Sequence, residues 1–474
     1  MQEPEVLENQ TSSRGRIRWR RHLGIGIALV LGFLVGEIFL TFYWAGQQLT
    51  KTLAELDRAD PGWRLEDLEA RRPVLADEEN SALRALAAHA LLPSPWPTNP
   101  PEDEPTLEIS TRDLAPTMQL SAQQLKLLTA AMTEAEAAVK EAHTLANMPR
   151  GRHTIVYLPN TIAILLPHVQ PVRQIANVLT YDAMLRAQLG DVDGALESCR
   201  AGVNAGRSLG EEPFLISQLV RMAIRAIIHR SIERTLAQGE PSQAALEALQ
   251  RLLEEDEPEP LLLYGSRGER ALMDKFIVAG QSGQMTHAEL TKAMAALGLP
   301  GNELGVLFFV GTARHNRIAL LEFESRMVEL AKLSGPKQSE QLQPLERSAK
   351  DLPFITRLLV PAFAKVAEAH HRTLAELRCD IVALAAERYR RSHGDWPTAL
   401  AELLPEDLKQ IPADPFDDQP LRYRRLTDGV VIYSIGLDRQ DNGGNVDRSQ
   451  PYAPGTDIGI RLWDLPHRRR PARP

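Results

Sequence analysis

The stretch DRQDNGGNVD at residues 438–447 holds the side chains whose types and spacing are best suited to chemistry, because carboxylates and amides cluster there. Calcium takes six to eight oxygen ligands, which clustered aspartates and backbone carbonyls supply. Compared with an EF-hand loop, Asp438, Asn442 and Gly443 fall at positions one, five and six. Position twelve is Ser449, however, where a bidentate glutamate is required. The residues alone leave two interpretations open, a calcium site and a solvated, turn-rich loop.

Cysteine and histidine occur without the spacing that redox or metal chemistry requires. Cys199 and Cys379 are the only cysteines, and they form neither a CxxC motif nor part of a Cys/His cluster. They lie far apart in the chain, so we expect two single buried thiols, although a pairing between them stays open. His370 and His371 are adjacent on a predicted helix, where neighbouring side chains point in different directions, and no further ligand follows at zinc spacing.

The sequence contains no recognisable catalytic motif. In YGSRG at 264–268, Ser266 has glycine at the wrong spacing for the Gly-Xaa-Ser-Xaa-Gly elbow of serine hydrolases. His287 and His315 stand alone in helical segments. The sequence therefore predicts a protein that is not an enzyme, with an envelope hydrolase as an alternative.

Residues 23–45, LGIGIALVLGFLVGEIFLTFYWA, form an apolar run of the length that crosses a bilayer, since a spanning helix needs roughly 20 apolar residues. Arginines cluster between residues 14 and 21, and no comparable cluster follows the run. Basic residues favour the cytoplasmic side, so the pattern predicts a cytoplasmic stub over 1–22, a single transmembrane anchor over 23–45 and an extracytoplasmic remainder. A cleaved signal peptide is the alternative, but its apolar region is shorter and ends at small residues, whereas Tyr43 precedes the one plausible cut.

Composition sets the broad class of the protein. The chain has 474 residues, of which 43% are hydrophobic and 24% charged, as in globular proteins. About 430 residues outside the membrane are too many for one ordinary core, so two domains are expected. The net charge of −8 argues against nucleic acid as a partner.

Helical periodicity, with apolar residues recurring at three and four positions, dominates from about residue 118 to 392. One part, LRAQLGDVDGALESCRAGV with a turn at Gly190-Asp191, is similar to a single tetratricopeptide-type helix hairpin. Several copies are needed for a solenoid, and no 34-residue repeat surrounds this one. We therefore expect a mainly α protein with an irregular, weakly tetratricopeptide-like helical bundle over 47–370.

Two charged segments are expected to be solvated. The acidic run EEDEPEP at 254–260 closes a predicted helix, and such runs are usually solvated helix ends. The arginines and prolines of 465–474 predict a disordered basic tail. Neither segment is expected to hold a binding site.

The chain changes character after Gly394. Residues 421–426, 430–435 and 457–463 alternate in the manner of strands, and Thr427-Asp428-Gly429 is a hairpin turn signal. We expect a small α+β module over 371–464 that follows a long helix.

This module resembles a known family. Residues 378–463 contain, in order, RCDIVALAAERYRRSHGDWPTALAEL, LKQIPADPFDDQPLRYR, YSIGLDRQDNGG and GTDIGIRLW, which is the order of the C-terminal half of the major pseudopilins of type II secretion. The resemblance covers about a fifth of the chain. A pseudopilin has one continuous helix where this chain has some 330 residues of helical domain, which puts filament assembly in doubt. The chain as a whole resembles uncharacterised membrane-anchored bacterial proteins, which implies a topology and no activity.

The pseudopilin resemblance implies a calcium site in the Asp-rich loop. The matching positions are Asp438, Asp441, Asp447 and Asp457, together with the backbone carbonyl of Leu437. No other cofactor is expected.

These observations predict a single-pass protein of the bacterial inner membrane with a cytoplasmic N-terminus. We expect a non-enzymatic interaction or scaffold protein whose partners are the membrane and other envelope proteins. The alternative is a pseudopilin-like component of a type II secretion-type system. Processing such as that of a pseudopilin would leave Phe33 at the N-terminus, because Gly32, Phe33 and Glu37 have the required spacing.

Overall fold

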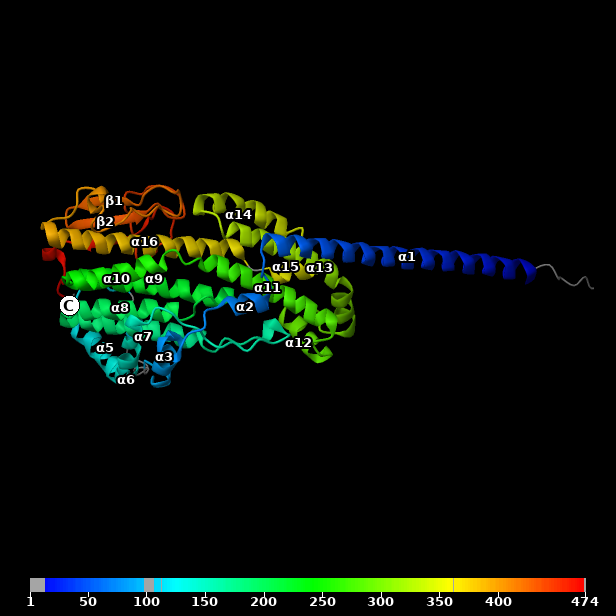
Figure 1. Ribbon diagram of the computed structural model, residues 1–474, viewed down its shortest axis with the longest axis horizontal. Helices are drawn as coiled ribbons and strands as arrows, with labels where there is room; N and C mark the ends of the chain where they lie inside the picture. Colours follow the sequence, from blue (N-terminus) through cyan, green and yellow to red (C-terminus); the bar gives the residue numbers. More distant parts are fainter. Residues whose placement is uncertain (1–12, 98–105, 112, 361, 473–474) are drawn as a thin grey trace, which may run out of the picture.

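Helices build most of this protein, and one small antiparallel sheet stands near its C-terminus (Figure 1). The structure, a computed structural model, describes residues 13–97, 106–111, 113–360 and 362–472. The predicted mainly helical fold with a small strand-containing region near the C-terminus is confirmed. Residues 1–12 of the predicted stub lie outside the described residues.

α1 (Ser13–Ala59) is a single helix of 47 residues that continues beyond the anchor predicted at 23–45. Its C-terminal part packs on the body through Leu49, Leu53 and Leu56, which cluster with Leu321. The preceding part projects away from the body (Figure 1). Within the described part of the chain, none of the helices combines the length and apolarity needed to cross a bilayer.

The remaining helices form the body. In chain order they are α2 (Leu65–Arg71), α3 (Ser81–Ala90), α4 (Leu107–Thr111), α5 (Ala122–Glu134), α6 (Glu136–His143), α7 (Val169–Leu189), α8 (Val192–Arg207), α9 (Leu215–Gln238), α10 (Gln243–Asp256), α11 (Leu261–Ser282), α12 (His287–Ala296), α13 (Glu303–Leu330), α14 (Gly335–Ala349), α15 (Phe354–Leu359) and α16 (Phe363–His393).

The predicted turn between α7 and α8 is confirmed. Gly190 ends α7 with a φ of +90°, a conformation that glycine adopts at no steric cost. Asp191 then caps α8, because its Oδ1 accepts a hydrogen bond from the backbone N–H of Gly194 at 3.0 Å. The two helices therefore pack as a hairpin.

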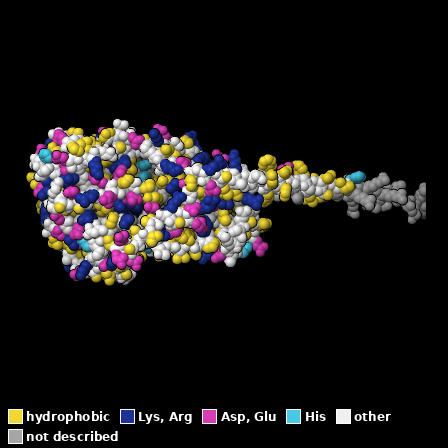
Figure 2. Space-filling view, in the orientation of Figure 1, with side chains coloured by type: hydrophobic (Ala, Val, Ile, Leu, Met, Phe, Trp, Pro, Cys, Tyr) yellow, Lys and Arg dark blue, Asp and Glu magenta, His cyan; other side chains and the backbone are white. Residues whose placement is uncertain are grey.

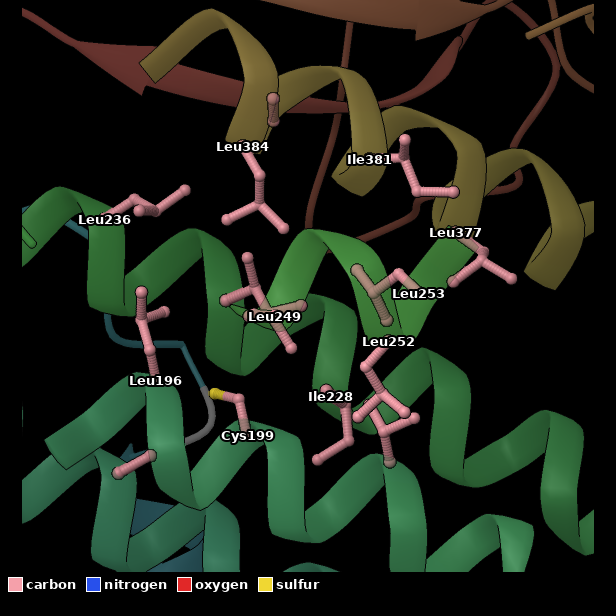
Figure 3. Packing of buried hydrophobic residues seen from close by; sticks show 14 of the residues in the cluster. Leu196, Cys199, Ile228, Leu236, Leu249, Leu252, Leu253, Leu377, Ile381 and Leu384 are labelled. Carbon is pink, nitrogen blue, oxygen red and sulfur yellow. The ribbon is translucent and has the colours of Figure 1, made fainter. Parts of the chain in front are cut away.

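The central core lies between α8, α9, α10 and α16 (Figure 3). Leu377, Ile381 and Leu384 recur on one side of α16 and point toward α9 and α10 (Figure 3). Ala375 and Cys379 recur on another side, where Ala375 clusters with Ile458 and the thiol of Cys379 lies 3.8 Å from the Ile458 carbonyl oxygen. α16 thus packs on the bundle with one face and on the sheet with another.

The sheet contains β1 (Arg422–Leu426), β2 (Gly429–Ser434) and β3 (Ile458–Trp463) in the order β1-β2-β3, with both pairs antiparallel. The three predicted strands and the hairpin turn are confirmed. β2 is buried along its length, and Val430 and Ile432 belong to the same hydrophobic cluster as the bundle. The boundary predicted at 370–371 falls inside α16.

The prediction of a disordered C-terminal tail is wrong for residues 465–472. Arg468 is buried and forms a bidentate ion pair with Glu387 of α16, with Nη1–Oε1 and Nη2–Oε2 distances of 3.0 and 2.9 Å. Arg470 donates its backbone N–H to the Thr117 carbonyl at 2.7 Å. The last two residues lie outside the described part. Hydrogen bonds hold the tail on the bundle, and the sequence alone does not reveal their partners.

The prediction of a solvated acidic helix end is wrong for Asp256, the last residue of α10. Asp256 is buried and accepts hydrogen bonds from Arg221 and Arg225, each at 2.7 Å. A third buried guanidinium, that of Arg207, lies 3.7 Å from the same carboxylate. Although burial opposes ionisation, these guanidinium groups hold the pKa of Asp256 well below its usual range.

Candidate functional site

A cavity of about 470 Å³ lies between the bundle and the C-terminal sheet, a volume typical of small-ligand sites. Its walls come from Thr111 of α4, residues 113–116, α7, α9, α16, β3 and the loop that precedes β3. Leu114, Met184 and Ile227 contribute apolar surface. Charged side chains converge on the same space.

His229 of α9 is a buried cationic side chain of this cavity. Its Nδ1 lies 2.8 Å from Oδ1 of Asp380 on α16. Burial by itself lowers the pKa of His229, but the carboxylates of Asp380, Glu376 and Glu233 outweigh burial and raise it to about 9. The imidazole is therefore protonated at neutral pH.

Glu233, one turn after His229 on α9, joins the bundle to the C-terminal region. Its Oε2 accepts a hydrogen bond from Nε of Arg448 at 2.6 Å, and its Oε1 accepts a second from Arg448 Nη2. Oε1 also accepts the backbone N–H of Arg461 on β3 at 2.9 Å. This bidentate, charge-assisted pair fixes the loop before β3 against α9.

Glu376 of α16 is the one carboxylate of the cavity with an unused buried oxygen among the described residues. Its Oε1 accepts a hydrogen bond from the Tyr452 hydroxyl at 2.9 Å. Its Oε2 is buried and has no hydrogen-bond partner. The Arg372 guanidinium lies 4.2 Å from the centre of the Tyr452 ring. Because an unmatched buried acceptor is costly, Glu376 favours a ligand that brings a donor.

The predicted calcium ligands Asp438 and Asp441 use their oxygens within the loop. Asp438 Oδ1 accepts the Gln440 N–H at 3.0 Å, and its Oδ2 accepts the Gly455 N–H at 2.8 Å. Asp441 Oδ1 accepts the Gly443 N–H at 2.9 Å. Both carboxylates order the loop through backbone donors.

Asp447 and Asp457 also accept hydrogen bonds from nearby residues. Asp457 is buried, and its Oδ2 accepts the N–H groups of Gly444 and Asn445 at 2.8 and 3.1 Å. Asp447 Oδ1 accepts the Ser449 hydroxyl at 2.7 Å. Asp447 and Asp457 lie on the cavity wall.

The structure does not gather the four aspartates into one group of metal ligands. Among residues 13–97, 106–111, 113–360 and 362–472, no three His, Cys, Asp or Glu side chains are grouped so that they could hold a metal. Calcium binding by this loop stays a prediction that only the pseudopilin resemblance carries.

The two cysteines are single buried thiols, as predicted. Burial raises the pKa of both, which disfavours the reactive thiolate. His370 and His371 lie on α16 with the pKa of each lowered by burial, to about 3 and about 4. None of these four residues belongs to a group of possible metal ligands in the described part of the chain.

The charged residues of the cavity are not among those predicted from the sequence, although their spacing carries a signal. His229 and Glu233 are four residues apart on one helix, and Glu376 and Asp380 are four apart on another. Residues at this spacing share a helix face. The sequence does not show that these two faces meet, so the cluster could not be inferred.

Comparison of the chain with protein-family models, with curated proteins and with solved structures found no match.

The His229–Asp380 pair predicts a pH-dependent stability. The pKa of His229 in the folded protein, about 9, lies above the unfolded value of about 6.5, so its contribution is fully present below about pH 6.5 and is lost as the pH rises toward 9. The protein and its His229→Gln variant should differ in their free energies of unfolding. We expect this difference to shrink by about 3 kcal/mol from pH 6 to pH 9.5. Urea unfolding at both pH values measures it. The exposed His287→Gln variant is the control and should show no such change.

Proposed function

We propose that this protein is a single-pass, membrane-anchored, extracytoplasmic interaction protein without enzymatic activity. The observation that carries the proposal is the bare apolar surface of the projecting part of α1 (Figure 2). The side chains of Leu29, Phe33 and Phe39 are 70%, 67% and 71% exposed there. Apolar surface of this extent marks a membrane or protein contact rather than solvated surface. The arginines that precede it favour a cytoplasmic N-terminus in a bacterial inner membrane.

The neighbouring helix α13 supports the same assignment. Arg314 of α13 donates to the Phe42 carbonyl at 3.4 Å, and Leu321 clusters with Leu53 later in α1, so the two helices run parallel. Leu304 and Leu307 precede Arg314 and are 76% and 68% exposed. At 1.5 Å per residue they lie about 10 to 15 Å farther toward the N-terminus of α1, level with its apolar surface. Both helices thus present apolar side chains at one level.

The proposal predicts that charges on α1 release the protein from membranes. In the triple variant Leu29→Lys, Phe33→Lys and Phe39→Lys, three charges would enter the bilayer at a cost of several kcal/mol. We expect the protein to sediment with membranes after carbonate washing and the triple variant to be soluble. Leu189→Lys, at an equally exposed position on α7, is the control and should stay with the membranes. Release of the unchanged protein by carbonate would contradict the anchor.

A pseudopilin-like secretion component is the alternative. Mass spectrometry of the N-terminus and of co-purifying proteins separates the two. An intact N-terminus with other envelope proteins supports an anchored interaction protein, whereas an N-terminus at Phe33 with secretion subunits supports the alternative.

A further inference from the structure

β3 is an edge strand whose outer side faces the cavity. It pairs only with β2, so alternate residues direct their N–H and C=O groups away from the sheet. Arg461 is one such residue, because its N–H is bound by Glu233 rather than by β2. By the same alternation Gly459 and Trp463 also present their backbone groups outward.

Most of this outer edge is already capped. Glu233 occupies the N–H of Arg461, and Nε of Arg468 donates to the Trp463 carbonyl at 2.8 Å. Gly459 lines the cavity, and among the described residues its backbone groups form no hydrogen bond outside the sheet. At Gly459 the outer edge of β3 therefore opens into the cavity.

Residue 459 is glycine for a steric reason. A Cβ atom built on it would lie 2.3 Å from the Ile432 carbonyl oxygen and 2.8 Å from Cβ of Tyr433. Any side chain would displace the backbone of β2. The absence of a side chain also leaves the N–H and C=O of Gly459 open to a ligand's backbone.

The cavity beyond Gly459 is suited to an extended chain. Ile227 of α9 and Leu114 form an apolar wall, and Glu376 supplies the buried oxygen that lacks a donor. Addition of a strand at a sheet edge derives affinity from main-chain hydrogen bonds and selectivity from side-chain pockets. A donor with positive charge forms the strongest hydrogen bond to a carboxylate.

We propose that the cavity binds a short, extended peptide segment that pairs with the backbone of Gly459 and places an ammonium group against Glu376. The ammonium belongs either to the N-terminus of the segment or to a lysine side chain. This inference rests on the interaction role proposed above, for which it names the partner chemistry, and it does not depend on the membrane anchor.

Hydrogen exchange of the full-length protein in detergent micelles tests the inference. The probes are a pool of lysine-free tripeptides with free N-termini, the same pool acetylated, and an acetylated pool containing lysine. We expect binding to slow exchange at least threefold in 456–463 and to leave the capped N–H of Arg461 unchanged. Protection by the first pool but not the second identifies an N-terminal ammonium, and protection by the third identifies lysine.

Three variants separate peptide binding from general stabilisation. Glu376→Gln keeps an acceptor for Tyr452 but removes the charge, so affinity should fall at least tenfold. Glu402→Gln alters an exposed carboxylate that accepts a tyrosine hydroxyl at the same distance of 2.9 Å, and it should bind as the unchanged protein does. Ala115→Trp fills the exposed mouth of the cavity and should abolish protection.

The inference is overturned if none of the pools protects 456–463, or if Ala115→Trp leaves protection intact. Protection in a protein that carbonate releases from membranes would contradict the anchor and leave the peptide site standing. A protein that stays in the membranes but shows no protection would contradict the peptide site and leave the anchor standing.

Discussion

Replacement of Asp256 by asparagine is expected to destabilise the protein by about 4 kcal/mol or more, since removal of one partner from a buried ion pair costs roughly 3–5 kcal/mol. Asp256 is the shared carboxylate of Arg207, Arg221 and Arg225, all of which are buried. Asparagine keeps an acceptor of similar shape but removes the charge that the three buried guanidinium groups share, and among the described residues only Arg221 keeps another carboxylate nearby, that of Glu259 at 3.8 Å. The whole stability of a domain is about 5–15 kcal/mol, so the loss is a large fraction of it.

Urea unfolding in detergent micelles measures the effect. Glu255→Gln removes an exposed charge from the same acidic segment and should change the free energy of unfolding by less than about 0.5 kcal/mol. An Asp256→Asn variant as stable as Glu255→Gln would contradict the central role assigned to Asp256. Because the guanidinium groups lower its pKa, the contribution of Asp256 is present above the unfolded pKa and is lost as the pH falls.

Replacement of Arg468 by methionine is expected to detach the C-terminal segment and to cost about 3 kcal/mol. The change removes two hydrogen bonds to the buried Glu387, the bond to the Gly239 carbonyl at 2.5 Å and the bond to the Trp463 carbonyl at 2.8 Å. Arg390 remains against Glu387, with Nη2 at 2.7 Å from Oε1, and limits the loss. Faster hydrogen exchange over 463–472 should accompany the lower stability.

Arg470→Met is the matched control for Arg468→Met. Arg470 is exposed and contributes its backbone rather than its side chain, through the bonds to Thr117 and Gln119. We expect the Arg470→Met variant to have the same free energy of unfolding and the same hydrogen exchange as the unchanged protein. Equal destabilisation by both substitutions would mean that net charge, and not the pair with Glu387, holds the segment.

Local patterns predicted the elements of the fold well. The turn at Gly190 and the strands around residue 429 are encoded by neighbouring residues, because glycine with a positive φ and alternating apolar residues act over a few positions. The same patterns do not encode long-range partners. Asp256 and Arg468 were therefore assigned to solvent, although each is paired with residues from other helices.

The candidate site shows the same difference between local patterns, which the sequence reveals, and long-range contacts, which it does not. The Asp-rich loop was conspicuous in the sequence, yet its carboxylates bind nearby N–H groups. The cavity forms where α9, α16 and β3 approach one another. These elements contribute His229, Glu376 and Gly459, and more than a hundred residues separate His229 from Glu376 in the sequence. Each is unremarkable in its own segment, so only the tertiary arrangement reveals them.

The two-sided packing of α16 has a consequence for biosynthesis. α7 to α10 are complete long before α16 leaves the ribosome, and a nascent chain that ends before Phe363 carries Ile228, Leu249 and Leu252 without the helix that covers them. The hydrophobic core thus closes late, after most of the polypeptide has been made. Until then the unfinished chain has to keep an apolar face away from its neighbours, which is the situation in which chaperones are needed.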